Sequence, residues 1–276
     1  MNIKEIKFSV LMSLYFKESE KYLHACFSSI YNQTLPCTEL VCVYDGPLTD
    51  ELEDVVTDWS KRLPIKVVRL TKNVGLGNAL NEGLKHCSYD LVARMDTDDV
   101  CLDTRFEEQI TYMAANPKTV LLGSSIYECA SDINKITSIR KVPTENDDII
   151  KFARLKNPFN HMTVMFNKSA IISVGGYKHH YFMEDYNLWL RVMAKSFPVA
   201  NLDNSLVIVR AGANMLSRRS GISYLKSEYK LAKLKYTLHF QSLLPAIITF
   251  LIRGAPRILP LTLLSYIYKK SRASDH

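Results

Sequence analysis

Two kinds of segment alternate over the first hundred residues. Short apolar runs of strand length are separated by longer stretches in which apolar residues recur at helical spacing. The runs that predict strands are Phe8–Tyr15, Leu40–Tyr44, Ile65–Leu70 and Leu91–Arg94. The stretches that predict helices are 19–33, 48–63 and 73–87. Strands that alternate with helices form βαβ units, so we expect an α/β fold with a mostly parallel central sheet flanked by helices.

The second hundred residues continue the pattern less regularly. Further strands are predicted at 120–128, 136–142, 160–166 and 206–210, and further helices at 103–116, at 145–155 and from Glu184 onward. The charge then changes. Residues 216–276 contain 11 Lys or Arg and two acids, a net charge of +9, whereas the remainder has 24 basic and 26 acidic residues. We therefore divide the chain into a main domain, 1–215, and a basic C-terminal extension, 216–276.

The extension holds two apolar segments, 243–252 and 258–268, which Pro245 and Pro260 interrupt. Both are shorter than the roughly 20 residues that span a bilayer. Apolar segments with Arg, Lys and Tyr at their flanks predict helices that lie in a membrane interface, and the segregated positive charge suits an anionic membrane. Docking onto the main domain is the alternative. Nucleic-acid binding is a third interpretation, which the apolar segments disfavour.

The composition fits a globular protein with a substantial core. Of the 276 residues, 47% are hydrophobic and 23% are charged. The polar start predicts no signal peptide. The six cysteines form no CxxC pair, so we expect reduced, buried thiols in a cytoplasmic protein.

An acidic cluster directly follows the fourth apolar run. Residues two apart on an extended backbone point to one side, so Asp96 and Asp98 can face one point. Carboxylates are the ligands that Mg²⁺ and Mn²⁺ prefer, although an isolated acidic cluster also suits a solvated turn or a helix cap. Other strands also end in polar or aromatic residues: Tyr15, Asp45 and Asn73. Because ligands bind beyond the carboxyl ends of parallel strands, this gathering favours a site.

Several pieces of sequence occur in the order typical of one enzyme family. They are Ser9–Tyr15, Tyr44-Asp45-Gly46, Asn73–Leu76, Ala93–Asp99, and Gly175-Gly176-Tyr177 followed by Glu184–Arg191. Over about residues 7–215 the chain resembles the family 2 glycosyltransferases with the GT-A fold, in particular the bacterial enzymes that build O-antigen and capsule repeats. Two pieces depart from the family: Ser13-Leu14-Tyr15-Phe16 replaces Pro-Thr-Tyr-Asn, and Tyr44-Asp45-Gly46-Pro47 replaces Asp-Asp-Gly-Ser.

The resemblance implies inverting transfer of a hexose from a UDP-sugar, with UDP-Glc or UDP-Gal favoured. The implied acceptor is GlcNAc or GalNAc linked to undecaprenyl diphosphate, at the cytoplasmic face of the inner membrane. It also implies Mn²⁺ or Mg²⁺ held by Asp98 and Asp96, because charge on the leaving diphosphate must be neutralised. A sugar nucleotidyltransferase is the rival enzyme class, but residues 9–20 lack its Gly-rich loop. A non-catalytic nucleotide-sugar-binding module is the other rival.

The implied donor site is Tyr15, Asp45, Asn73, Arg94, Asp96, Asp99, His161 and Arg210. Tyr15 would stack on uracil and Asp45 would accept from its N3–H. Each also has a structural alternative: a packed aromatic for Tyr15, a turn residue for Asp45, a helix cap for Asn73, a salt bridge for Arg94 and a packed histidine for His161.

Asp185 is the implied general base that takes the proton from the acceptor hydroxyl. Its neighbour Glu184 would bind or orient the acceptor. Both acids begin a predicted helix, so the alternative is that they only compensate the positive helix N-terminus.

Overall fold

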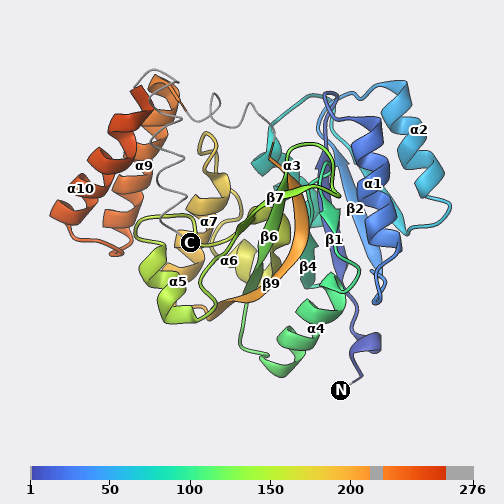
Figure 1. Ribbon diagram of the computed structural model, residues 1–276, viewed down its shortest axis with the longest axis horizontal. Helices are drawn as coiled ribbons and strands as arrows, with labels where there is room; N and C mark the ends of the chain where they lie inside the picture. The colour runs from blue at the N-terminus through green and yellow to red at the C-terminus, as the bar shows by residue number, and fades with distance from the viewer. Residues whose placement is uncertain (1, 212–219, 259–276) are drawn as a thin grey trace.

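A central β-sheet with helices on both faces forms the fold of the computed structural model, which describes residues 2–211 and 220–258 (Figure 1). The strands are β1 (Ser9–Leu14), β2 (Glu39–Tyr44), β3 (Ile65–Arg69), β4 (Leu91–Arg94), β5 (Val100–Cys101), β6 (Leu121–Cys129), β7 (Ile136–Arg140), β8 (Met165–Asn167) and β9 (Val199–Arg210). The helices are α1 (Glu20–Tyr31), α2 (Asp50–Trp59), α3 (Leu76–His86), α4 (Arg105–Ala115), α5 (Asn146–Phe152), α6 (Lys168–Ser173), α7 (Glu184–Ala194), α9 (Ile222–Thr237) and α10 (Leu243–Gly254). Short 3₁₀ turns occur at η1 (Ile3–Glu5), η2 (His161–Thr163) and η3 (Ala255–Ile258).

The N-terminal half of the sheet is parallel, as the βαβ pattern predicts. The strand order is β3-β2-β1-β4-β8-β6-β9-β5, with β7 beside β6. β1 pairs in parallel with both β2 and β4, and β2 pairs in parallel with β3. Their carboxyl ends therefore meet at one edge, where the residues that follow β1, β2 and β4 can form a common site.

The C-terminal half mixes strand directions. β8 is antiparallel to β4 and β6, whereas β9 runs parallel to β6. The two-residue β5 pairs with the end of β9, placing Val100 opposite Ile208. This pairing brings Arg210 beside the acidic cluster that separates β4 from β5, although the two lie more than a hundred residues apart in sequence.

Two strand predictions are wrong in detail. Residues 160–166 do not form one strand, because Asn160 and Thr163 bond to the backbone of Ser124 and hold a 3₁₀ turn at η2 before β8 begins. β9 starts at Val199, seven residues before the predicted strand. The first part of β9 contains polar residues such as Asn201, so no apolar run marks it as a strand. The Asn201 amide donates to the Pro143 and Pro158 carbonyls.

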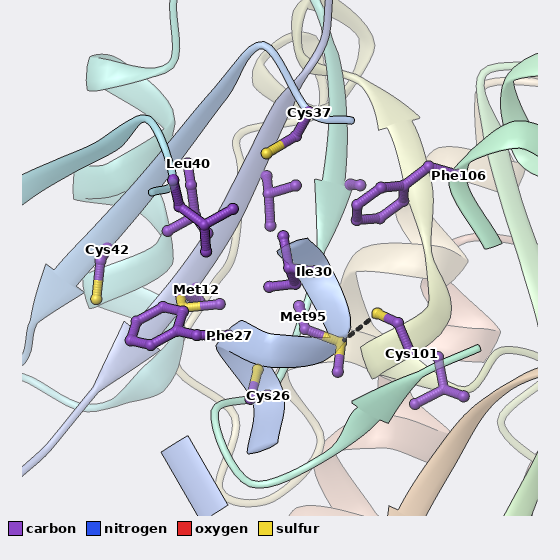
Figure 2. Packing of buried hydrophobic residues seen from close by; sticks show 14 of the residues in the cluster. Met12, Cys26, Phe27, Ile30, Cys37, Leu40, Cys42, Met95, Cys101 and Phe106 are labelled. Atoms are coloured by element: carbon purple, nitrogen blue, oxygen red, sulfur yellow. Dashed lines mark hydrogen bonds between the residues drawn. The ribbon is translucent and has the colours of Figure 1, made fainter. Parts of the chain in front are cut away.

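The hydrophobic core forms one layer on each face of the sheet. On one face, α1, α2 and α4 pack over the strands, and α3, α5, α6 and α7 pack on the other. Figure 2 shows part of the first layer, in which Phe27 and Ile30 of α1 lie close to Met12 and Met95. The Cys101 thiol lies 3.4 Å from the Met95 sulfur, so this layer continues directly beneath the acidic cluster. All six cysteines are free and buried, as expected.

The described part of the C-terminal extension is a helical hairpin of α9 and α10, which lies at the opposite end of the molecule from α1 and α2 (Figure 1). Pro245 does not break α10, because it lies in the first turn, where no intrahelical donor is required. Within 2–211 and 220–258, no helix has the length and apolarity needed to cross a bilayer. The second predicted apolar segment, 258–268, lies outside the described residues except for its first residue.

Close packing of α3 on β1 and β2 yields a prediction about two glycines of that helix. A Cβ at Gly83 would lie 2.7 Å from Val43 Cγ2 and closer still to Leu11, whereas one at Gly77 would meet its nearest atom at 3.3 Å. Both alanines gain helix propensity, but overpacking costs about 1–3 kcal/mol. We expect Gly83→Ala to have a free energy of unfolding about 1–3 kcal/mol below that of Gly77→Ala in urea denaturation. Equal stability of the two variants would show that α3 is not held tightly against the sheet.

Candidate active site

Three carboxylates gather at the end of β4. Asp96, Asp98 and Asp99 each offer an oxygen, and these three atoms lie within 4.8 Å of one another. The turn that follows β4 is fixed from below, because the buried Arg105 guanidinium donates to the Arg94 carbonyl at 2.7 Å. Hard carboxylate oxygens at this spacing fit a divalent cation such as Mg²⁺ or Mn²⁺.

Arg94 organises the cluster from inside the protein. Its side chain is 1% exposed, and both of its terminal nitrogens donate to the Asp96 carboxylate, one of them at 2.6 Å. A bidentate pair of this kind fixes the plane of the carboxylate as well as its position. The salt-bridge alternative for Arg94 is therefore what the structure shows, and it serves to orient the acidic cluster.

Arg210 joins the cluster from the end of β9. Its backbone N–H donates to Asp99 at 3.0 Å, its guanidinium donates to the Asp98 carbonyl, and it stacks over the Tyr22 ring with 4.2 Å to the centroid. Asp99 is thereby buried as a support, while the side chain of Asp98 takes part in no ion pair with any residue in the described ranges.

The cluster concentrates negative charge. Burial, together with the negative charges of Asp96 and Glu18, raises the pKa of Asp98 to about 7. Burial also raises the pKa of Asp99 well above its usual range, with its two acidic neighbours adding to the effect. A bound cation would relieve this repulsion, which is the electrostatic condition that favours metal binding.

The carboxyl ends of β1 and β2 carry the predicted base-binding residues. Asp45 follows β2 and accepts from the N–H groups of Val74 and Gly75 at 2.6 and 3.0 Å. Asn73 donates to the Asp45 carbonyl at 3.1 Å and does not cap α3, whose N-cap is Gly75. These bonds hold the 73–75 loop against the sheet. Tyr15 directly follows β1 with 38% of its surface exposed, so it is not a packed core aromatic.

Glu18 links the Tyr15 turn to the acidic cluster. Its N–H donates to the Tyr15 carbonyl, and its carboxylate accepts from Thr97 Oγ at 2.6 Å. Asp45 lies next along the same edge, since its N–H donates to the Leu14 carbonyl. The structure therefore brings the residues that follow β1, β2 and β4 together at one edge of the sheet.

His161 lies on the buried side of the candidate site, against Tyr177 and Trp189. Its Nε2 is 2.8 Å from the Tyr177 hydroxyl, and its ring packs edge-on against Trp189. Burial lowers its pKa well below the usual range, and the charge of Arg94 lowers it further, so the imidazole is neutral at physiological pH. This arrangement suits a hydrogen-bonding or positioning role and disfavours a cationic contact to phosphate.

The two acids at the start of α7, Glu184 and Asp185, both have raised pKa values. Burial raises the pKa of Glu184 to about 7. Burial also raises the pKa of Asp185, and the positive charge of Arg94 offsets part of that increase. The Asn157 amide donates to Asp185 Oδ2 at 2.6 Å. Glu184 packs against the first turn of α3, so the start of α7 adjoins the 73–75 loop. Both acids begin the helix, so the structural alternative of compensating its positive N-terminus holds beside any role in the site.

One buried arginine links the Gly-Gly-Tyr turn to the helix that begins with Glu184 and Asp185. Arg191 lies on α7 and donates to the carbonyls of Val174 and Gly176. The turn is also bound to α3, because Asn81 exchanges hydrogen bonds of 2.8 Å with both backbone groups of Tyr177. Gly176 has φ +60, and a Cβ there would lie 2.5 Å from Asn81. The turn, α3 and α7 therefore hold one another in place.

The sequence patterns missed three residues of this site. Asn157 orients Asp185, Tyr177 pairs with His161, and Glu18 connects the Tyr15 turn to the acidic cluster. Tyr177 lies in a recognised piece, so its position offered a signal. Asn157 and Glu18 lie in irregular segments without any pattern, and only tertiary contacts reveal their roles.

Comparisons with known proteins agree with this geometry. The sequence profile described as glycosyl transferase family 2 matches residues 9–181. The chain is 48% identical, over 96% of its length and 99% of the relative, to the amylovoran biosynthesis glycosyltransferase AmsE of Erwinia amylovora. It is 39% identical, over 96% of each chain, to the UDP-Gal:alpha-D-GlcNAc-diphosphoundecaprenol beta-1,3-galactosyltransferase of Escherichia coli.

Solved structures support the same fold. The mannosyltransferase PcManGT of Pyrobaculum calidifontis, solved in complex with GDP-Man and Mn²⁺, superposes with a TM-score of 0.63 at 14% identity. The alignment covers 99% of this chain and 82% of that one. The architecture is the GT-A fold, and the profile match together with the two relatives shows that this chain belongs to glycosyl transferase family 2.

Proposed function

We propose that this glycosyltransferase moves a hexose from UDP-Glc or UDP-Gal to GlcNAc or GalNAc linked to undecaprenyl diphosphate, in the assembly of O-antigen or a related polysaccharide. One observation carries the proposal. The buried Arg94, which bonds to Asp96 of the carboxylate cluster, is also close enough to Asp185 at the start of α7 for its charge to lower the pKa of that acid, which supports a shared site. The galactosyltransferase relative, whose name gives this class of donor and acceptor, supports it across nearly the whole chain.

The donor is expected at the edge formed by β1, β2 and β4. Each Asp45 oxygen accepts one backbone N–H, which leaves lone pairs for the N3–H of uracil. Tyr15 is exposed beside it and can cover the ring. Asn73 completes the loop, while Asp96 and Asp99 shape the floor below the ribose and diphosphate.

Asp98, assisted by Asp96, is the site we propose for Mn²⁺ or Mg²⁺. When bound, the cation supplies positive charge that stabilises the leaving diphosphate. Arg94 keeps Asp96 in a fixed orientation, and Arg210 holds the backbone of Asp98 and the carboxylate of Asp99. These contacts preorganise the acidic cluster, so little reorganisation is needed as charge develops.

Asp185 is the proposed general base. It accepts the proton of the acceptor hydroxyl as that oxygen attacks the anomeric carbon on the face opposite the diphosphate. A single displacement inverts the anomeric centre, so an α-linked UDP-sugar gives a β-linked product. Glu184 lies between Asp185 and the first turn of α3, where it can bind an acceptor hydroxyl.

We also propose that the hairpin of α9 and α10 binds the membrane surface, at the cytoplasmic face of the inner membrane. Six aliphatic side chains form an exposed stripe on α10: Leu243, Leu244, Ile247, Ile248, Leu251 and Ile252. The opposite face of α10 is buried through Ala246 and Thr249. An aliphatic stripe beside exposed Lys226, Lys230 and Tyr229 on α9 is the composition that favours an anionic bilayer interface. Such a surface would bring the enzyme to a lipid-linked acceptor.

A donor and acceptor screen tests the proposed reaction. UDP-Glc, UDP-Gal, UDP-GlcNAc and UDP-GalNAc are each offered with a synthetic lipid-diphosphate GlcNAc or GalNAc, and disaccharide formation is measured. Transfer from UDP-Glc or UDP-Gal supports the proposal. UDP binding without transfer to either acceptor would instead indicate a binding module.

The first prediction concerns the metal. EDTA should abolish transfer, and Mn²⁺ or Mg²⁺ should restore it. Asp98→Ala should lower the rate by about 10²-fold or more, the scale of removing one strong electrostatic stabiliser. Asp103→Ala removes an exposed acid of the same loop region and should leave the rate unchanged. Full activity of metal-free protein would contradict the metal assignment.

The second prediction concerns the base. Asp185→Asn keeps the shape but cannot accept a proton, so turnover should fall about 10²–10⁴-fold while UDP affinity, measured by calorimetry, is retained. Because burial raises the pKa of Asp185, the wild-type rate should fall with decreasing pH at a higher pH than for an ordinary carboxylate, as the base becomes protonated. NMR of the product should show a β linkage. An α-linked product or near-normal turnover of the variant would remove Asp185 from this role.

The third prediction concerns the aliphatic stripe. The full-length protein should bind anionic phospholipid vesicles and be partly released by salt, which screens the attraction to headgroups. Leu244→Ser with Ile252→Ser should weaken vesicle binding about tenfold or more, because burying each aliphatic side chain contributes about 1.5–3 kcal/mol at most. The control Ile136→Ser with Ile172→Ser removes exposed aliphatics elsewhere and should not change binding. Equal binding of both double variants would refute the assignment of this surface.

A further inference from the structure

The α9–α10 hairpin also contacts the turn that follows α5, where its side chains donate hydrogen bonds to two consecutive backbone carbonyls. Lys235 Nζ donates to the Arg154 carbonyl at 2.8 Å, and Arg253 donates to the Leu155 carbonyl at 2.5 Å. The preceding carbonyl, of Ala153, accepts from the Tyr186 hydroxyl of α7 at 2.7 Å. Carbonyls at a helix C-terminus lack intrahelical partners and favour cations, so these groups stabilise the end of α5.

Buried groups fix both side chains that hold this turn. Arg253 forms two hydrogen bonds, of 2.8 and 2.9 Å, to the Glu228 carboxylate, which is 2% exposed. Lys235 is 1% exposed, and its ammonium lies 4.7 Å from the centroid of the Tyr186 ring. Tyr186 directly follows Asp185, so the hairpin contacts α7 within its first turn. Hydrogen bonds to buried partners on several elements define one geometry for Lys235 and Arg253.

The held turn ends at the residue that orients the base. Asn157 lies two positions after Leu155, and its amide donates to Asp185 Oδ2 at 2.6 Å. The other end of the same amide accepts from the Phe159 N–H, so the Asn157 side chain cannot rotate without losing a bond. One oxygen of Asp185 is thereby fixed, which sets the direction of the remaining one.

We propose that the α9–α10 hairpin positions the general base: Lys235 and Arg253 hold the 153–157 turn, and Asn157 in that turn orients the Asp185 carboxylate. The inference rests on the proposed role of Asp185 and adds positioning residues to it. The hairpin then has a second task besides binding lipid, since the same helix pair that carries the aliphatic stripe fixes the carboxylate that meets the acceptor.

Substitutions at the two ends of this contact chain test the proposal. Asn157→Ala removes the donor to Asp185, and Lys235→Met removes the donor to the turn while keeping its volume. Lys195→Met, at an exposed position just after α7, is the matched control. Transfer is assayed in solution with a short-chain lipid-diphosphate GlcNAc and whichever donor supports turnover, so that membrane binding does not contribute.

Both test variants should lower kcat about 10–100-fold, the scale of a small misplacement of a reacting group. Their KM for the UDP-sugar and their UDP affinity should stay within about twofold of wild type, because the donor contacts are unchanged. The hydrogen bond from the Asn157 side chain lowers the pKa of Asp185. In Asn157→Ala this bond is lost, so the acid limb of the pH–rate profile should also move to higher pH. The titratable groups that act on Asp185 are the same in every variant: Arg94, Arg140, Tyr177, His180, Glu184 and Tyr186.

The outcomes separate this inference from the function on which it rests. If Asp185→Asn is inactive but Asn157→Ala and Lys235→Met keep wild-type kcat and pH profile, the hairpin only packs on the domain and the inference is wrong. If Asp185→Asn is active, the proposed base is wrong instead. A parallel loss of UDP affinity would also contradict a positioning role. Should Lys235→Met fold poorly, Arg253→Met, which removes the hairpin's donor to the Leu155 carbonyl, takes its place and should lower kcat in the same way.

Discussion

The buried ion pair between Arg94 and Asp96 is the interaction on which the site depends. A guanidinium that is 1% exposed requires a partner, and the carboxylate at the end of β4 provides it through two hydrogen bonds. Arg105 fixes the same backbone from below. The charge of Arg94 also acts on His161 and Asp185. One desolvated cation therefore orients the acidic cluster, and its charge adds to the effect of burial on the pKa of His161 and opposes it on the pKa of Asp185.

The architecture separates the two kinds of work that the proposed reaction needs. The parallel strands β1, β2 and β4 end in residues that suit a nucleotide and a cation, and their register is fixed by hydrogen bonds along the sheet. The proposed acceptor side lies at α5, α7 and the irregular turns between them, which depend on side-chain bonds such as those of Asn81 and Arg191.

The C-terminal hairpin packs on the turn after α5 and on the first turn of α7. Glu228 and Lys235 are buried between α9, α10 and the main domain, and Arg253 bonds to Glu228 at the edge of this contact. The stripe on α10 stays exposed because its side chains point away from this contact. The predicted membrane surface and the alternative, docking onto the domain, are therefore compatible: docking is visible for 220–258, and it leaves an aliphatic face available.

The sequence by itself determined the sheet of βαβ units, the acidic cluster after β4 and the acids that begin α7, because these depend on local periodicity and on residues close together in the chain. Its predictions failed at 160–166 and at the start of β9, where hydrogen bonds from distant residues override local pattern. Only the tertiary structure decided that Arg210 meets Asp99 across 111 positions and that Asn157 orients Asp185. Such contacts arise where strands of mixed direction and irregular turns converge, and no local pattern encodes that convergence.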